Sequence, residues 1–490
     1  MAAGVSDLVT RFSLIRKSAP DRTLIHLPAA GGEWSADDLW HAHQRYSDRL
    51  AKIGVGHGDL VISAAGNSAA SVALLLACRA LDAAMMPVDA GAAHTELLAL
   101  AERFGATALL APDTSFAPDP RLDGDRAAVL DAGLRVSPTL EIERRSFAGS
   151  AVLKLTSGST GTAKATLTSE AQLVADSARI LAAMKIRPSD VQLATIPVSH
   201  AYGFGNLILP VLLQGTAVVL RDSFVPQQLQ ADARRFGARV FQGVPFMFQF
   251  FLSTPLAGGW PSSLASLFSA GAPLPAAMVR AFHERFGVKI HSFYGTTETG
   301  GISLDEDDEV DDSGTVGRPL PGVTVTLRNE EDVIGRIHVA STAVATGYSD
   351  VGRRADDAFV DGGFLTGDCG AFDGKGRLTL SGRVSSFVNV AGQKVRPDEV
   401  EEVLRTMPGI ADARVVGADD PSRGEQIVAC VVAEPEGSIA ELAVRRFCAA
   451  RLAPHKVPRT IVFVGAIPVT PRGKIDRAAL EGIVRARLTV

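Results

Sequence analysis

The sequence has little cysteine, and its cysteines do not form a recognisable site. There are four in 490 residues, and no two of them have a C-x-x-C spacing. Their distribution excludes the common zinc sites and a disulfide framework. Isolated cysteines in a long chain are typical of a reducing compartment, so we expect a cytoplasmic protein in which Cys78, Cys369, Cys430 and Cys448 are small buried hydrophobic side chains.

A long hydrophobic run is also missing. The longest apolar segment, Val72 to Cys78, ends at Arg79 and falls far short of the about 20 residues that cross a bilayer. The N-terminal segment is amphipathic and has no uninterrupted apolar core of the kind that a signal peptide needs. We therefore expect no membrane span.

Neither sign of charge dominates the chain. The 49 lysines and arginines nearly balance the 54 aspartates and glutamates, which leaves a formal net charge of −5. A chain without a basic excess has no electrostatic signature for nucleic acid or for an anionic membrane. We expect no nucleic-acid partner, and the sequence sets no oligomeric state.

What the chain does have is an alternation of short apolar runs with helical patterns. Leu60–Ala64 predicts a buried strand, Ser68–Leu81 a helix and Met85–Val88 the next strand. Such alternation indicates βαβ units and mostly parallel sheets, with ligands at the carboxyl ends of the strands. The same pattern predicts further strands at Ala106–Ala111, Val152–Leu155, Gln192–Ile196, Ala217–Leu220, Val240–Gln242 and Ile290–Phe293.

The pattern changes toward the C-terminus. Strand-like runs at Val323–Leu327 and Gly335–Ala340 suggest a small antiparallel region, and the acidic segment Asp305–Asp312 reads as a solvated loop. After Arg383 the order becomes strand, helix, strand, strand, helix, strand. We predict an α/β protein with a large N-terminal domain, residues 1–383, and a small mobile α+β domain, residues 384–490.

One run of hydroxyls and glycines, Leu155 to Lys164, is suited to holding phosphates. Its backbone N–H groups and hydroxyls can surround a phosphate chain, and its lysine adds a positive charge. A Walker A loop is excluded, because Ala163 replaces its second glycine and Ala165 its magnesium-binding hydroxyl. By itself the run is equally compatible with a flexible surface loop. The candidate phosphate residues are Thr156, Ser157, Gly158, Ser159, Thr160, Gly161 and Lys164.

Six further segments follow this loop in a fixed order: Ser269–Pro273, Tyr294–Gly300, Thr366–Asp368, Gly382–Arg383, Asn389–Lys394 and Pro471–Arg477. One more, Gly56–Val61, precedes it. Together they resemble the adenylate-forming superfamily, which includes acyl- and aryl-CoA synthetases, nonribosomal peptide adenylation domains and beetle luciferases. The resemblance extends over nearly the whole chain.

The resemblance implies a two-step reaction. A carboxylate attacks the α-phosphate of Mg-ATP, giving an acyl-adenylate and pyrophosphate, and a thiol then displaces AMP. The predicted function is an AMP-forming carboxylate–CoA ligase that uses ATP, Mg²⁺ and coenzyme A. The alternative is an acyl-AMP ligase that loads the phosphopantetheine thiol of a carrier protein. Since no carrier domain follows residue 490, such a carrier would act in trans.

Roles for the nucleotide site follow from the resemblance. Thr297 would contact phosphate, Glu298 would bind Mg²⁺, Tyr294 would stack on adenine and Asp368 would accept both ribose hydroxyls. Each has a plainer alternative: a helix N-cap with a first-turn acid for Thr297 and Glu298, a core aromatic for Tyr294, a turn for Asp368. The remaining predicted nucleotide contacts are Gly271, Ala272, Pro273, Gly295, Thr296 and Arg383, the last with an interdomain salt bridge as its alternative.

Lys474 matches the catalytic lysine of the superfamily. It would bridge the attacking carboxylate and the α-phosphate as charge develops in the transition state, unless it is merely an exposed lysine. The resemblance also implies that the small domain rotates between the steps and presents the loop with Gly392 and Lys394 to the thiol. Ser385 stands where the superfamily usually has Asp or Lys at the pivot. His200, Thr297 and Glu298 complete the predicted catalytic set.

The acid is less well defined. Val198–Asn206 lies where the superfamily builds its acyl pocket, and no aspartate between Asp190 and Asp222 is available to hold an α-ammonium group. Since burying an unpaired ammonium is costly, we predict an uncharged aryl or fatty acid. The predicted pocket residues are Tyr202, Gly203, Val244, Gly300 and Gly301, for which ordinary core is the alternative; Gly295, Gly300 and Gly301 would leave room for a ring or chain.

Two other function classes deserve comparison. A non-catalytic nucleotide-binding scaffold is disfavoured, because the key residues of every motif are intact; these are Lys164, Glu298, Asp368, Arg383 and Lys474. A luciferase-type oxygenase is a remote fourth hypothesis, since a shared fold does not decide the chemistry.

Overall fold

The computed structural model describes most of the chain. The described residues are 6–116, 119–122, 126–131, 133–140, 142–156, 164–328, 334–349, 358–383, 388–390, 393–395, 397–420, 424–434, 439–452, 454–469 and 475–488. By its contacts the chain divides into two units. The first comprises Met1–Thr326, His338–Thr366 and Phe372–Thr379, and the second Leu327–Ile337, Gly367–Ala371 and Leu380–Val490. The predicted boundary at residue 384 stays a prediction.

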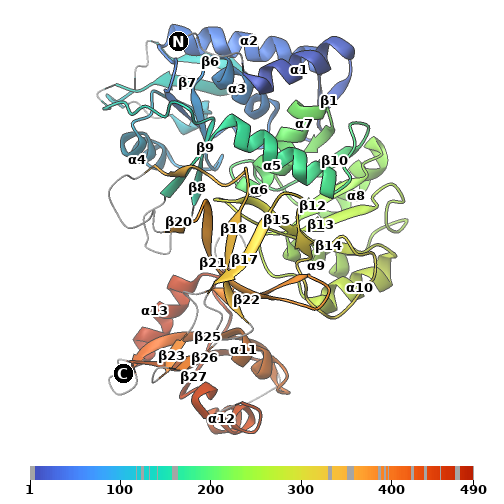
Figure 1. Cartoon of the computed structure of the whole chain (residues 1–490), viewed down its shortest axis with the longest axis vertical. Helices are drawn as coiled ribbons and strands as arrows, with labels where there is room; N and C mark the ends of the chain where they lie inside the picture. Colours follow the sequence, from blue (N-terminus) through green and yellow to red (C-terminus); the bar gives the residue numbers. More distant parts are fainter. Residues whose placement is uncertain are drawn as a thin grey trace. The chain divides into compact units, whose positions relative to one another are not determined.

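The first unit contains an eight-stranded sheet with a parallel centre (Figure 1). Its strands, in spatial order, are β19 (Gly347–Tyr348), β9 (Lys164–Thr168), β8 (Val152–Thr156), β4 (Ala84–Pro87), β3 (Leu60–Ser63), β5 (Ala108–Pro112), β7 (Leu134–Pro138) and β6 (Ala128–Asp131). Strands β8, β4, β3 and β5 run parallel, and the strands at both edges are antiparallel. The predicted strands at Leu60–Ala64 and Met85–Val88 are confirmed.

A nine-stranded sheet lies in the same unit. Its order is β16 (Arg318–Pro319), β15 (Gly300–Leu304), β14 (Ile290–Thr296), β13 (Ser266–Ser269), β12 (Val240–Gly243), β10 (Val191–Ala194), β11 (Ala217–Leu220), β1 (Thr23–Leu27) and β2 (Gly32–Ser35). From β14 to β1 all neighbours are parallel, as the alternating pattern predicts. The carboxyl ends of β12, β13 and β14 therefore meet at one edge of the sheet.

Helices connect these strands. They are α1 (Asp7–Ser18), α2 (Ala36–Lys52), α3 (Ala69–Ala80), α4 (His94–Phe104), α5 (Glu170–Ala183), α6 (Ala201–Gly203), α7 (Leu209–Gln214), α8 (Pro226–Phe236), α9 (Pro245–Ser253) and α10 (Ala276–Phe286), with the short turns η1 (Asp113–Ser115) and η2 (Phe204–Ile208). None of the described helices is long and apolar enough to span a membrane.

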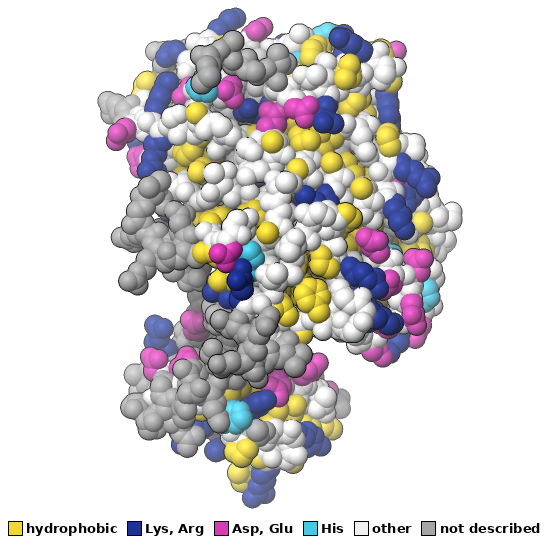
Figure 2. Space-filling view, viewed as in Figure 1, with side chains coloured by type: hydrophobic (Ala, Val, Ile, Leu, Met, Phe, Trp, Pro, Cys, Tyr) yellow, Lys and Arg dark blue, Asp and Glu magenta, His cyan; other side chains and the backbone are white. Residues whose placement is uncertain are grey.

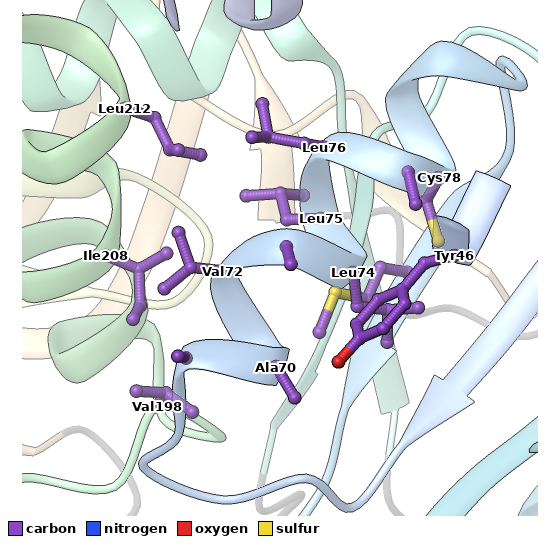
Figure 3. Packing of buried hydrophobic residues seen from close by; sticks show 14 of the residues in the cluster. Tyr46, Ala70, Val72, Leu74, Leu75, Leu76, Cys78, Val198, Ile208 and Leu212 are labelled. Carbon is purple, nitrogen blue, oxygen red and sulfur yellow. The ribbon is translucent and has the colours of Figure 1, made fainter. Parts of the chain in front are cut away.

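Helix α3 is buried along nearly its whole length. Residues Ala69 to Arg79 are all buried, which is the pattern of a helix enclosed on every side rather than of an amphipathic surface helix. Figure 3 shows Leu76 of α3 directed toward Leu212 of α7, and Val72 facing Ile208. Helix α3 thus packs against elements of both large sheets, and one hydrophobic cluster of the first unit includes residues from each.

The second unit carries an α+β arrangement. Its sheet has the order β24 (Gln393–Val395), β23 (Val388–Val390), β26 (Gly424–Ala433), β25 (Ile410–Asp420), with β27 (Thr460–Phe463) beside β26, and its helices are α11 (Pro397–Arg405), α12 (Glu441–Ala449) and α13 (Arg477–Leu488), with the turn η5 (Pro454–Lys456). The predicted order of strands and helices is confirmed. Strand β24 and helix α13 were not predicted.

A further sheet has five strands. Its strands are β17 (Thr324–Arg328), β18 (Gly335–Ala340), β21 (Gly363–Phe372) and β20 (Phe359–Val360), with β22 (Leu378–Arg383) beside β21. Strands β20 and β21 pair antiparallel. The sequence predicted strands at two of these positions, Val323–Leu327 and Gly335–Ala340.

A buried ion pair fixes the start of α5. The Arg79 Nε donates to the Glu170 carboxylate at 2.9 Å, and the other carboxylate oxygen accepts from Ser6 Oγ at 2.7 Å and from the Leu8 N–H at 2.6 Å. Both side chains of the pair are nearly buried, 8% exposed for Arg79 and 13% for Glu170. Three helices, α1, α3 and α5, therefore meet at one carboxylate.

Replacing one partner of this pair should destabilise the first unit. Arg79→Met leaves the Glu170 carboxylate buried without its cation, and we expect a loss of about 3 kcal/mol in the free energy of unfolding. The exposed pair Arg11–Asp7 on α1 gives the control, and Arg11→Ala should cost no more than about 0.5 kcal/mol. Urea denaturation checks both values, and equal losses for the two variants would contradict the role assigned to Arg79.

Candidate functional site

The two ends of the hydroxyl- and glycine-rich loop are held together by a strand pair. Thr156 at the end of β8 lies opposite Lys164 at the start of β9, and its Oγ1 donates to the Lys164 carbonyl oxygen at 3.4 Å. The residues between them, which include the predicted Ser157, Gly158, Ser159, Thr160 and Gly161, lie outside the described residues. The structure thus places the beginning and the end of the predicted phosphate loop at one edge of the eight-stranded sheet.

Lys164 and Glu298 are brought together by a residue that the sequence did not single out. The Lys164 Nζ lies 5.3 Å from the centre of the Tyr348 ring, and the Tyr348 hydroxyl donates to Glu298 Oε1 at 2.8 Å. Tyr348 is positioned by β19, which pairs with β9 two residues beyond Lys164. A lone Gly-Tyr pair carries no sequence signal of its own, so only the fold identifies it.

Thr297 and Glu298 lie on a tight connection between β14 and β15. The two strands form an antiparallel hairpin in which Thr296 lies opposite Gly300. The Thr299 N–H donates to Thr296 Oγ1 at 3.3 Å, and the Glu298 carbonyl oxygen accepts from the Ala345 N–H at 2.7 Å. The alternative of a helix N-cap is therefore wrong, because the chain turns back into a strand here.

The predicted adenine contacts lie at the carboxyl ends of neighbouring strands. Gly271, Ala272 and Pro273 follow β13 and are exposed, and Tyr294 lies in β14, with 8% of its surface exposed. Gly271 has a φ of +79°, a conformation that favours glycine, and a Cβ there would lie 3.6 Å from Val244 Cγ1. Adenine stacking on Tyr294 stays a prediction, because burial of its ring also fits the core alternative.

Tyr202 is a partly buried residue in the predicted acid pocket. Its hydroxyl donates to the Phe268 carbonyl oxygen at 3.4 Å, its ring lies 6.0 Å from that of Phe293, and burial raises its pKa above the ordinary tyrosine value. It belongs to the short helix α6, which continues into the π-helical turn η2, a geometry frequent at functional sites. His200 immediately precedes α6, and its N–H donates to the Pro197 carbonyl oxygen at 3.0 Å.

The space beside the predicted pocket glycines is filled by the protein. A Cβ on Gly295 would meet the Gly300 carbonyl oxygen at 2.6 Å, and one on Gly301 would meet Leu320 Cδ1 at 2.9 Å. A Cβ on Gly300 would collide with the carboxylate of Asp176, and that on Gly203 with the backbone of Pro197. The expectation that Gly295, Gly300 and Gly301 leave room for a ring or chain is wrong for the positions that their Cβ atoms would take.

Two buried ionisable residues, Lys154 and Asp176, lie near Glu298. Burial lowers the pKa of Lys154, against the opposing effect of the Asp176 and Glu298 carboxylates. Burial likewise raises the pKa of Asp176, opposed by Lys154 and by the hydrogen bond that its carboxylate accepts from the Gly301 N–H at 2.9 Å. The sequence offered one signal of a buried charge, because Lys154 lies inside the strand predicted at Val152–Leu155.

Other predicted residues belong to segments farther along the chain. Asp368 lies in β21, in a segment assigned to the second unit. Arg383 ends β22 and Lys394 lies in β24, but their side chains lie outside the described part. Gly392, Ser385 and Lys474 lie outside it as well. The roles of these residues stay predictions.

The chain matches known proteins along most of its length. Residues 15–349 match the model of the AMP-binding enzyme family, and residues 399–474 match that of the AMP-binding enzyme C-terminal domain. It is 31% identical over 338 residues to sulfoacetate–CoA ligase of Cupriavidus necator, covering 67% of this chain and 66% of the relative. It is 29% identical over 460 residues to feruloyl-CoA synthase of an Amycolatopsis species, covering 90% and 91%.

A solved structure shows the same architecture. ATP-bound MatB from Rhodopseudomonas palustris superposes with a TM-score of 0.81 at 25% identity, over 97% of this chain and 98% of that one. The predicted α/β fold with a large N-terminal part and a small C-terminal part is confirmed.

Proposed function

Because the chain belongs to the AMP-binding enzyme family, we propose how its site carries out ligation. The chain is an AMP-forming carboxylate–CoA ligase of the acyl-CoA synthetase type. In the first step a carboxylate oxygen attacks the α-phosphorus of ATP, and the bond to pyrophosphate breaks. In the second, the thiol sulfur attacks the acyl carbon, and the bond to AMP breaks.

One series of contacts gives the strongest support for a phosphate- and metal-binding site. Lys164, Tyr348 and Glu298 link the end of the phosphate loop to the hairpin turn that bears Thr297 and Glu298. Phosphoryl transfer depends more on positioned charges than on covalent catalysis by the protein. These contacts place a cation and a carboxylate on either side of one tyrosine.

The donor set at this turn fits Mg²⁺. Magnesium is usually held by one or two carboxylates together with phosphate oxygens, and Glu298 supplies a carboxylate whose Oε1 is fixed by Tyr348. We propose Glu298 as the protein ligand, with Thr297 beside it for phosphate. When bound, the metal would neutralise charge on the phosphates.

Roles for the remaining nucleotide residues are part of the same proposal. Asp368 accepts both ribose hydroxyls, Tyr294 stacks on adenine, and Arg383 contacts the nucleotide. Lys474 supplies positive charge between the carboxylate and the α-phosphate as the first step proceeds. Their support is the order of motifs along the chain together with the match of both family models.

The acid and the thiol substrates are proposed as chemical classes. The partly buried aromatic Tyr202 and the apolar Val244 favour an aryl or fatty acid. Coenzyme A is the proposed thiol, and a carrier protein acting in trans is the alternative. On the part of the face coloured in Figure 2, basic and acidic side chains are interspersed. The four buried cysteines support a reducing, cytoplasmic setting.

A panel of acids should identify the substrate class. We expect benzoates, cinnamates or fatty acids to stimulate pyrophosphate release from ATP, and an acyl-CoA product to form when coenzyme A is present. Coupled pyrophosphate assays and mass spectrometry of the thioester check both. Adenylation without an acyl-CoA product would shift the proposal to a carrier-protein thiol, and pyrophosphate release that no acid stimulates would contradict it.

Lys474 should act in the first step alone. Lys474→Ala should lower acid-dependent pyrophosphate release by at least about 10²-fold, a typical loss for a key electrostatic contact in a transition state. Thioester formation from synthetic acyl-adenylate should remain nearly intact. Lys375→Ala, at an exposed lysine, is the control and should leave both steps unchanged. An equal loss in both half-reactions of Lys474→Ala would refute the assigned role.

A further inference from the structure

Asp176 is a buried carboxylate directly behind the turn that bears Glu298. It lies on α5, is 7% exposed, and accepts the Gly301 N–H at 2.9 Å. It also occupies the space next to Gly300, where a side chain would collide with its carboxylate. Gly300 has a φ of +71°, which favours glycine independently. The start of β15 is therefore fitted to Asp176 both sterically and by a hydrogen bond.

This contact helps to determine the position of Glu298. The connection Thr297–Thr299 is short, so its conformation depends on where β14 ends and where β15 begins. At its first end, Thr296 Oγ1 accepts the Thr299 N–H at 3.3 Å. At the other end, the partner of the Gly301 N–H is Asp176. Displacing Gly300 and Gly301 would displace the turn.

We propose that Asp176 is a positioning residue for the metal- and phosphate-binding turn, because its carboxylate accepts the Gly301 N–H and fills the space beside Gly300. The inference rests on the proposed role of Glu298 and goes beyond it. Asp176 touches neither metal nor nucleotide. It acts through Gly300 and Gly301, much as residues behind a metal ligand orient that ligand.

The test measures ATP binding by calorimetry without acid, at stepped Mg²⁺ concentrations and in EDTA. For Asp176→Ala we expect the Mg²⁺-dependent affinity to fall by about tenfold or more, the range seen when supports of metal ligands are removed. Affinity for metal-free ATP should change by less than about twofold. Asp176→Asn, whose amide oxygen can still accept the Gly301 N–H, should show a smaller loss.

One further variant completes the design. Ser177→Ala is the matched control, since Ser177 is the next residue of α5, is also buried and has no hydrogen-bond partner for its Oγ. It should bind MgATP as the unaltered protein does.

The outcomes separate this inference from the function on which it rests. If Glu298→Gln leaves the Mg²⁺ dependence unchanged, the proposed role of Glu298 fails and the inference with it. If Glu298→Gln abolishes that dependence but Asp176→Ala does not alter it, only the inference fails. An equal loss with and without Mg²⁺ would show a general structural effect and also overturn it. Should Asp176→Ala not fold, Asp176→Asn carries the test.

Discussion

The hydrogen bond from Tyr348 to Glu298 is the interaction on which the site depends. It joins a turn at the edge of the nine-stranded sheet to β19 at the edge of the eight-stranded sheet. The same tyrosine ring lies beside the Lys164 ammonium at the end of the phosphate loop. Two sheets formed by separate parts of the chain are thereby connected where charge must be placed most accurately for phosphoryl transfer.

Helix α5 supports this arrangement from behind. Its first residue, Glu170, is tied to Arg79 and to the start of α1, and Asp176, almost two turns later, holds Gly301. A capping box at Ser169 and Gln172 fixes where the helix begins, directly after β9. The helix thus connects the core of the first unit to the candidate metal turn, and its buried charges are tolerated because each has an opposite charge or hydrogen-bond partner nearby.

Local patterns in the sequence predicted the parallel strands, helix α3 and the motifs at strand ends, because these depend on periodicity and on turn chemistry. Tyr348 and Asp176 were missed, since their importance comes from tertiary contacts with Glu298 and Gly301 that no local pattern encodes. The helix N-cap alternative for Thr297 failed for a related reason. A threonine followed by an acid also occurs in hairpin turns, and here the second strand, β15, pairs with β14.

The central claim is that the carboxylate attacks the α-phosphorus of ATP. It is tested most directly by supplying an activating acid labelled with ¹⁸O in its carboxylate, together with ATP and coenzyme A, and measuring the mass of the AMP produced. The account predicts that AMP carries ¹⁸O from the acid, because the carboxylate oxygen that forms the bond to phosphorus stays with AMP when the thiol attacks the acyl carbon. Formation of ADP and phosphate, or AMP without label, would contradict it.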